Sequence, residues 1–156
     1  MFLVGVVSLA AASCGGTKPG DEFTMKDQAS IRQRTDAFVK AFNAKAVDDI
    51  LSIYAENSVF MPPNEPVIRG KEALRTFYDD LLKSGATGLR LNVGEVSGHG
   101  PLAYQSGTYE MDLKPETGTP GRDRGKYLFV LRKMGETWRY EYSMWNSDLP
   151  VAASNP

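Results

Sequence analysis

Apolar positions in the first half of the chain repeat with helical spacing and predict three helices. The first helix is expected to begin near Thr24, because Thr24 and Asp27 fit a capping box that satisfies free backbone N–H groups. The second is expected over residues 47–54, and the third between Gly70 and Gly85. The apolar face of the first helix would carry Ile31, Thr35, Phe38 and Phe42, and that of the third Leu74, Phe77, Tyr78, Leu81 and Leu82.

Strand patterns dominate the second half of the chain. A short strand over residues 59–61 stops at two prolines, and alternating patterns predict four longer strands after Gly88, over residues 89–96, 102–114, 126–133 and 137–145. Residues 115–125 are predicted to form a polar loop that holds Arg122, Asp123 and Arg124 in solvent. Helices followed by strands favour an α+β fold with a mainly antiparallel sheet.

The last two predicted strands are expected to form a hairpin, because Gly135 and Glu136 between them suit a two-residue turn. An unbroken register from this turn places Lys126 opposite Trp145, Leu128 opposite Ser143 and Val130 opposite Glu141, all on one face. The other face would be densely aromatic, with Tyr127, Phe129, Leu131, Trp138, Tyr140, Tyr142 and Met144. A sheet with apolar residues on both faces must bury both of them, so we expect helices on one face and the partner of a homodimer on the other.

Composition limits the classes of function. The 156 residues include 42% hydrophobic and 24% charged residues, and the formal net charge is −1, so no basic excess favours nucleic acid as a partner. One Cys and one His exclude an internal disulfide and a four-ligand Cys/His zinc site. A histidine-based catalytic set would depend on His99 alone.

The N-terminal segment has the features of an export signal. Residues 1–13 are uncharged, largely apolar and too short to span a bilayer, and Cys14 follows small residues in a pattern that resembles a bacterial lipoprotein box. We therefore expect a lipid attached to Cys14, a flexible tether up to residue 22, a domain over residues 23–150, and a tail over residues 151–156. Membrane contact would be through the lipid anchor only, in the bacterial cell envelope.

The order of several short motifs resembles the nuclear transport factor 2-like superfamily, and in particular its SnoaL-like and ketosteroid-isomerase-like bacterial branch. The stretches that carry the resemblance are residues 52–63 (SIYAENSVFMPP), 69–74 (RGKEAL), 107–109 (GTY), 125–127 (GKY) and 145–150 (WNSDLP). The resemblance covers about residues 28–150. It implies a cone-shaped α+β fold, in which three N-terminal helices pack on a strongly curved, mixed and mainly antiparallel sheet around an apolar pocket. Members are often dimers through the outer sheet face and include isomerases, dehydratases and cyclases as well as binding and assembly domains, so fold alone does not choose a function.

The resemblance also implies that isomerase catalytic groups are replaced. The position of the carboxylate base carries Met61, that of the phenolic donor carries Phe38, and that of the protonated carboxylic acid lies near Leu128. Close SnoaL-like relatives often have Asp two residues before the final Trp, where this chain has Ser143. Residues expected to line the pocket are Phe38, Tyr54, Met61, Tyr78, Tyr109, Leu128, Ser143 and Trp145.

Three hypotheses about function follow. The first is a domain that binds a small apolar ligand or a partner in its pocket, with no metal and no cofactor. The second is a cofactor-free isomerase, dehydratase or cyclase in which Glu141 or Lys126 acts with Tyr109. The third is a dimeric assembly module. Composition alone would turn the aromatic sheet face inward, whereas the resemblance makes the face of Trp145 the pocket, and the sequence leaves this choice open.

Overall fold

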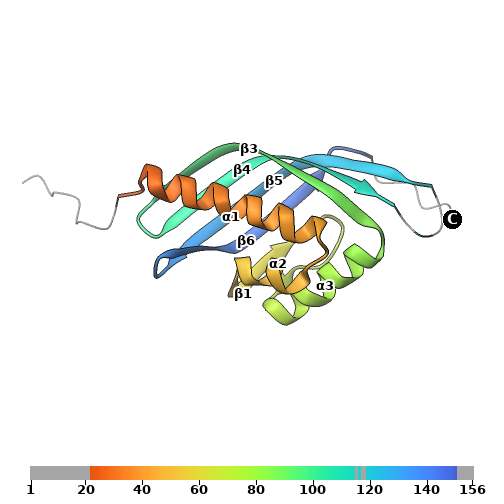
Figure 1. Cartoon of the computed structure of the whole chain (residues 1–156), viewed down its shortest axis with the longest axis horizontal. Coiled ribbons are helices and arrows are strands. Elements are labelled where there is room, and N and C mark those ends of the chain that lie inside the picture. The colour runs from red at the N-terminus through yellow and green to blue at the C-terminus, as the bar shows by residue number, and fades with distance from the viewer. Residues whose placement is uncertain (1–21, 115, 117–118, 151–156) are drawn as a thin grey trace, which may run out of the picture.

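The computed structural model describes residues 22–114, 116 and 119–150, and in this part of the chain three helices pack on a six-stranded sheet (Figure 1). The predicted signal segment with Cys14 and the tail over residues 151–156 lie outside the described residues. The elements are α1 (Met25–Asn43), α2 (Val47–Ile53), β1 (Tyr54–Met61), β2 (Ile68–Arg69), α3 (Lys71–Lys83), β3 (Ala86–His99), β4 (Leu102–Leu113), β5 (Gly121–Met134) and β6 (Thr137–Ser147).

The sheet has the strand order β2-β1-β6-β5-β4-β3, in which β1 runs parallel to β6 and all other pairs are antiparallel. Helix α1 lies across one face of the long strands, and α3 packs beside β1 and β3 (Figure 1). We call this helix-covered side the inner face and the opposite side the outer face. The architecture confirms the predicted α+β class, with N-terminal helices on a mixed, mainly antiparallel sheet.

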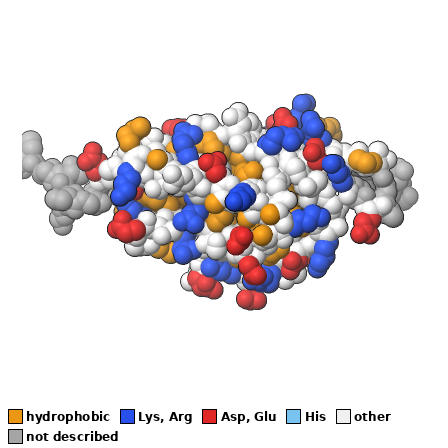
Figure 2. Space-filling model, viewed as in Figure 1, with side chains coloured by type: hydrophobic (Ala, Val, Ile, Leu, Met, Phe, Trp, Pro, Cys, Tyr) orange, Lys and Arg blue, Asp and Glu red, His pale blue; other side chains and the backbone are white. Residues whose placement is uncertain are grey.

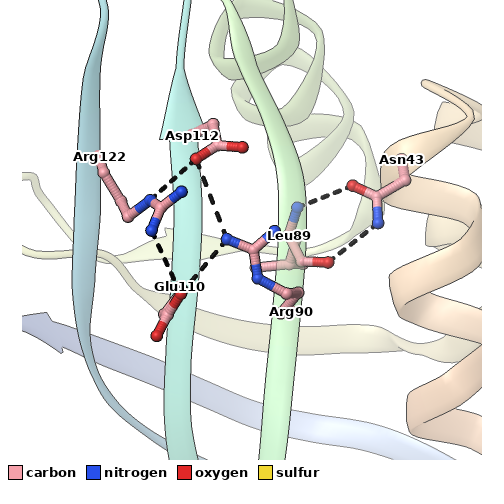
Figure 3. Close-up of polar contacts among 6 residues, drawn as sticks. All are labelled: Asn43, Leu89, Arg90, Glu110, Asp112 and Arg122. Carbon is pink, nitrogen blue, oxygen red and sulfur yellow. Dashed lines mark hydrogen bonds and ion pairs between the residues drawn. The ribbon is translucent and has the colours of Figure 1, made fainter.

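Both ends of α1 are held by side chains. Thr24 and Asp27 form the predicted capping box, in which each side chain accepts a hydrogen bond from the other residue's backbone N–H. At the other end, the Asn43 amide donates to the carbonyl of Leu89 at 2.9 Å and accepts from its N–H at 2.8 Å (Figure 3). This pair of bonds fixes the end of α1 to β3.

All the predicted strands except β4 are longer than the sequence pattern predicts. The strand β1 begins at Tyr54, which had been expected at the end of the second helix, and β5 begins at Gly121. Asp123 therefore lies within β5, where it pairs with Met111 of β4, and not in a solvated loop. Backbone pairing with a long neighbour extends a strand through polar residues that a hydrophobic pattern assigns to a loop.

The predicted register of the β5–β6 hairpin holds only near its turn. Leu131 lies opposite Tyr140 as predicted, but Val130 lies opposite Tyr142, so Glu141 is an extra residue in β6 and forms a β-bulge. The predicted pairs beyond this point are wrong by one position. The observed partners are Tyr142 for Val130, Met144 for Leu128 and Asn146 for Lys126.

The bulge decides which residues of β6 face inward. Trp138 and Tyr140 before it and Ser143 and Trp145 after it all lie on the inner face, whereas a regular strand would divide them between the two faces. Tyr142 is turned outward and is 44% exposed. Each of the two alternatives left open by the sequence is thus correct in part, since the inner face holds the aromatic residues of β5 and also Trp145, but not Tyr142 or Leu128.

The surface carries both signs of charge close together. Arg90 of β3 pairs with Glu110 of β4 at 3.3 Å, and Arg122 of β5 pairs with Asp112 of β4 at 3.1 Å (Figure 3). The helix-covered side shows acidic and basic side chains intermixed, and neither sign gathers in a large patch there (Figure 2). That side therefore lacks the broad positive surface that binding to a phosphate backbone requires.

Candidate functional site

A small apolar cavity lies between the inner face of the sheet and helices α1 and α3. Its volume is about 50 Å³, and every side chain in its wall is aliphatic, aromatic or a thioether. The wall consists of Phe38, Phe42, Tyr54, Phe60, Tyr78, Leu81, Leu89, Leu91, Tyr109, Met111, Tyr127, Phe129 and Trp145. Aromatic rings make up most of this wall, in the interior where the resemblance implied an apolar pocket.

Phe38 of α1 occupies the centre of this aromatic cluster. Its ring meets Tyr54, Tyr78 and Phe129 with centroid distances of 6.3, 6.2 and 6.1 Å, each near the edge-to-face arrangement that aromatic quadrupoles favour. Phe38 is 5% exposed. Because it has no hydroxyl, the wall lacks a donor at the position where the resemblance implies a catalytic phenol.

Tyr54 and Tyr78 hydrogen-bond to each other through their hydroxyls at 2.7 Å. Burial raises the pKa of Tyr54 to about 12, and burial together with the nearby Tyr54 raises the pKa of Tyr78 well above its usual value. Both groups therefore stay neutral phenols at physiological pH. They can hold a polar group of a ligand, but they are poor candidates for a general base.

A polar cluster on β4, β5 and β6 adjoins the cavity wall at Tyr109. The Tyr109 hydroxyl donates to Asp123 Oδ2 at 2.7 Å, and Ser147 Oγ donates to Asp123 Oδ1 at 2.6 Å. Burial and the neighbouring carboxylate raise the pKa of Tyr109, so the phenol keeps its proton. The arrangement presents hydrogen-bond acceptors next to an apolar wall.

Asp123 and Ser147 are the polar residues of this cluster that the sequence did not predict. The signal was present, because Asp123 has the same strand parity as Tyr127 and Phe129, which face inward. The polar residues around Asp123 favoured a loop, so the strand alternation was not extended to this residue.

The structure brings five of the eight predicted pocket residues into the cavity wall: Phe38, Tyr54, Tyr78, Tyr109 and Trp145. The other three lie elsewhere. Ser143 is fully buried on the inner face beside Phe129, and its Oγ has no hydrogen-bond partner among the described residues. Leu128 is on the outer face and 37% exposed, and Met61 lies beside Met144 at the edge of the β1–β6 pair.

The two charged residues proposed as catalytic groups lie outside the cavity. Glu141 accepts a hydrogen bond from Arg132 Nε at 2.7 Å, and Lys126 is exposed and pairs with Asp148. Both are on the outer side of the hairpin. Lys126 has the strand parity of the outward-facing Leu128, and Glu141 pairs with Arg132, which has the same parity. The structure therefore does not bring either residue together with Tyr109.

Neither a metal site nor a membrane span is found in residues 22–114, 116 and 119–150. No group of three His, Cys, Asp or Glu side chains in these ranges is arranged to hold a metal ion. None of the helices described there has both the length and the apolar character needed to cross a bilayer.

Comparisons with known proteins agree with this architecture. A family model described as a SnoaL-like domain matches residues 35–140. No curated protein matches the sequence.

Solved structures of similar fold come from several bacteria. A ketosteroid isomerase-like protein from Erwinia carotovora atroseptica superposes with a TM-score of 0.74 at 21% identity, over 81% of this chain and 100% of that one. A protein with a cystatin-like fold from Nostoc punctiforme gives a TM-score of 0.66 at 18% identity, over 81% and 95% of the two chains. An NTF-2-like protein from Shewanella oneidensis gives 0.63 at 18% identity, over 76% and 97%. At these identities the likeness extends to the fold alone.

Proposed function

Because the chain belongs to the SnoaL-like domain family, we propose that it is a binding domain whose inner cavity takes up a small apolar molecule without a cofactor. The observation that carries this proposal is the cavity wall, which consists of aliphatic, aromatic and thioether side chains and holds Phe38 where isomerase relatives are expected to hold a phenolic donor. Apolar walls favour ligands that remove carbon surface from water.

The size of the cavity sets the size of the ligand. An apolar protein cavity of roughly 150 Å³ is known to hold benzene, and the cavity here measures about 50 Å³. A ring-sized ligand must therefore displace wall side chains. Leu81, Leu91 and Trp145 are only partly buried, so they are the wall residues that can move with the least disruption of packing.

The affinity for such a ligand should be modest. A ligand of seven or eight non-hydrogen atoms gains at most about 1.5 kcal/mol per atom, and side-chain displacement reduces that gain. Dissociation constants in the micromolar to millimolar range are therefore expected.

Toluene is a suitable first probe, and the thermal midpoint of the domain is the readout. Wild-type protein in toluene-saturated buffer should melt at a higher temperature, because a ligand that binds only the folded state stabilises it. Leu81→Ala enlarges the cavity and should increase this shift. Leu128→Ala removes the same side chain from the outer face and should leave it unchanged. Absence of a shift in both wild type and Leu81→Ala would overturn the proposal.

A proton-transfer enzyme remains the second candidate, now with Asp123 in place of Glu141. The 2.7 Å bond between Tyr109 and Asp123 beside the wall is the observation that favours it. If it holds, the protein accelerates exchange of the α-hydrogens of cyclohexenone with D2O, and Asp123→Asn abolishes the acceleration. Exchange at the uncatalysed rate would remove this candidate.

We also propose that the outer face pairs two copies of the chain. Tyr104, Val130 and Tyr142 lie side by side across β4, β5 and β6 and face outward, and the exposed Leu128 lies in the adjacent row. A row of apolar and aromatic side chains on a regular sheet surface is typical of an interface.

The proposed location is the cell envelope, through a lipid on Cys14. Labelling of cells with a radioactive fatty acid, with Cys14→Ser as the unlabelled control, tests this proposal. Equal labelling of both proteins would contradict it.

A further inference from the structure

We infer that the carboxylate of Asp123 is the polar end of the ligand site and accepts a hydrogen bond from a donor group, a hydroxyl or an ammonium, at one end of an otherwise apolar ligand. The inference rests on the proposed binding function and adds the class of ligand to it.

The position of Asp123 follows from the β4–β5 register. Asp123 lies opposite Met111, and paired residues of an antiparallel sheet point to the same face. Met111 and Tyr109 both belong to the cavity wall. Asp123 is therefore on the inner face, next to the apolar wall, and it remains partly exposed to solvent.

Three hydrogen bonds fix the carboxylate in place. Oδ2 accepts from the Tyr109 hydroxyl at 2.7 Å, and Oδ1 accepts from Ser147 Oγ at 2.6 Å and from the backbone N–H of Arg124 at 2.9 Å. The donors come from β4, β6 and β5 in turn. Because the side chain is already held, little rotamer entropy is lost when a ligand binds to it.

The same bonds leave one acceptor position free. An ionised carboxylate offers about four lone-pair positions, two on each oxygen. Among the described residues, the bonds to Ser147 and Arg124 use both positions of Oδ1, and the bond from Tyr109 uses one of Oδ2. The remaining position lies on Oδ2, the oxygen shared with a residue of the cavity wall.

The groups at the Asp123 end of the ligand site select ligands that donate a hydrogen bond. The single hydroxyl hydrogen of Tyr109 is committed to Asp123, so the phenol oxygen offers only lone pairs to a ligand. A ligand hydroxyl or ammonium can donate to Oδ2, and such charge-assisted bonds are stronger than neutral ones. A ligand carboxylate would meet acceptors and a like charge, so acids should be rejected.

Four probes that share one ring separate these classes: toluene, benzyl alcohol, benzylamine and benzoate. Their affinities are measured by NMR titration of wild type, of Asp123→Asn, and of Asp112→Asn as a matched control on the outer side of β4. We expect wild type and Asp112→Asn to bind benzyl alcohol or benzylamine about tenfold more tightly than toluene, and benzoate more weakly than toluene. In Asp123→Asn the preference for the donor probes should fall to less than threefold, with toluene affinity retained.

A second measurement needs no variant. In protein labelled with ¹³C at aspartate carboxyl carbons, benzyl alcohol should move the Asp123 signal, and toluene should not.

The outcomes separate a failure of this inference from a failure of the proposed binding function. If no probe binds to wild type, the proposed binding function fails and the inference fails with it. If toluene binds but the donor probes have no advantage, or the advantage persists in Asp123→Asn, only the role of Asp123 is overturned. A stationary Asp123 carboxyl signal in the presence of bound benzyl alcohol would overturn it equally.

Discussion

The phenol of Tyr140 and the indole of Trp145 both lie on the inner face of β6, although a regular strand would place residues at this odd spacing on opposite faces. The extra residue between them, Glu141, reverses the alternation and keeps both rings inside. Phe129 stacks on Tyr140 with a centroid distance of 4.4 Å, and Trp145 packs on Phe60 at 5.1 Å. The bulge at Glu141 thus keeps the aromatic residues of both parts of β6 in the interior.

Deletion of Glu141 should therefore leave the fold intact. Without this residue β6 alternates regularly, and the observed pairs of Leu131 with Tyr140 and of Val130 with Tyr142 keep the same faces. The deletion removes the ion pair with Arg132, so we expect the free energy of unfolding to fall by under about 1 kcal/mol in urea titrations. Glu141→Gln keeps the bulge, weakens the same pairing and should cost a similar amount. A loss of about 3 kcal/mol or more in the deletion variant alone would show that the bulge itself stabilises the sheet.

Gly107→Ala should destabilise the domain, because a side chain at this position has no room. A Cβ atom on Gly107 would collide with the carbonyl oxygen of Asn92 and lie 2.9 Å from the ring and hydroxyl of Tyr127. The expected loss is about 2 kcal/mol, measured by thermal or urea unfolding. Gly121→Ala is the matched control, since a Cβ atom there meets nothing within 4 Å. A Gly107→Ala protein as stable as the control would contradict the tight packing of Tyr127 over β4.

The stability of the domain should fall in acid because of Asp27. Burial acts to raise the pKa of Asp27, but hydrogen bonds from Lys133, Thr24 and Trp138 outweigh it and hold the pKa well below its usual value. A lowered folded-state pKa means that the stabilisation is complete above the unfolded-state pKa of about 4 and is lost as the pH falls further. Urea titrations between pH 7 and pH 2 should show a loss of about 2 kcal/mol from this group.

Asp27→Asn should remove most of that acid dependence and lower the stability at pH 7. Asp36→Asn changes an exposed carboxylate on the same helix and serves as the control. An Asp27→Asn variant with the acid sensitivity of wild type would assign the effect to other groups.

The proposed dimer can be tested at Tyr142. Tyr142→Glu places a charge at the β6 end of the outward row with Tyr104 and Val130, where a partner subunit would have to desolvate it. Light scattering should show a dimer for wild type and a monomer for this variant, with Lys40→Glu on the exposed side of α1 as the control. Wild type that stays monomeric at high concentration would rule out both the dimer and the assembly function. Tyr140 is unsuitable for this test, because it is fully buried on the inner face.

Local patterns in the sequence determined much of the fold. The capping box at Thr24, the apolar face of α1 and the turn at Gly135 depend on interactions between residues close in the chain, and all three are found as predicted. The order of helices and strands and the SnoaL-like resemblance were likewise confirmed. Five of the predicted pocket residues, among them Phe38 and Trp145, lie in the cavity wall, because their positions follow from helical spacing and from the family motifs.

Only the tertiary structure decided which side chains meet at the site. Hydrophobic alternation assigns a face to a residue only while the register is unbroken, and no local signal marks the extra residue at Glu141. The error of one position placed Leu128 and Lys126 on the same face as Trp145, whereas the structure turns Trp145 inward and both of them outward. Asp123 was missed for a related reason, since pairing with β4 extends β5 through a polar run that resembles a loop. The contact between Tyr109 and Asp123 is a pairing across strands, and such pairings are set by the whole sheet.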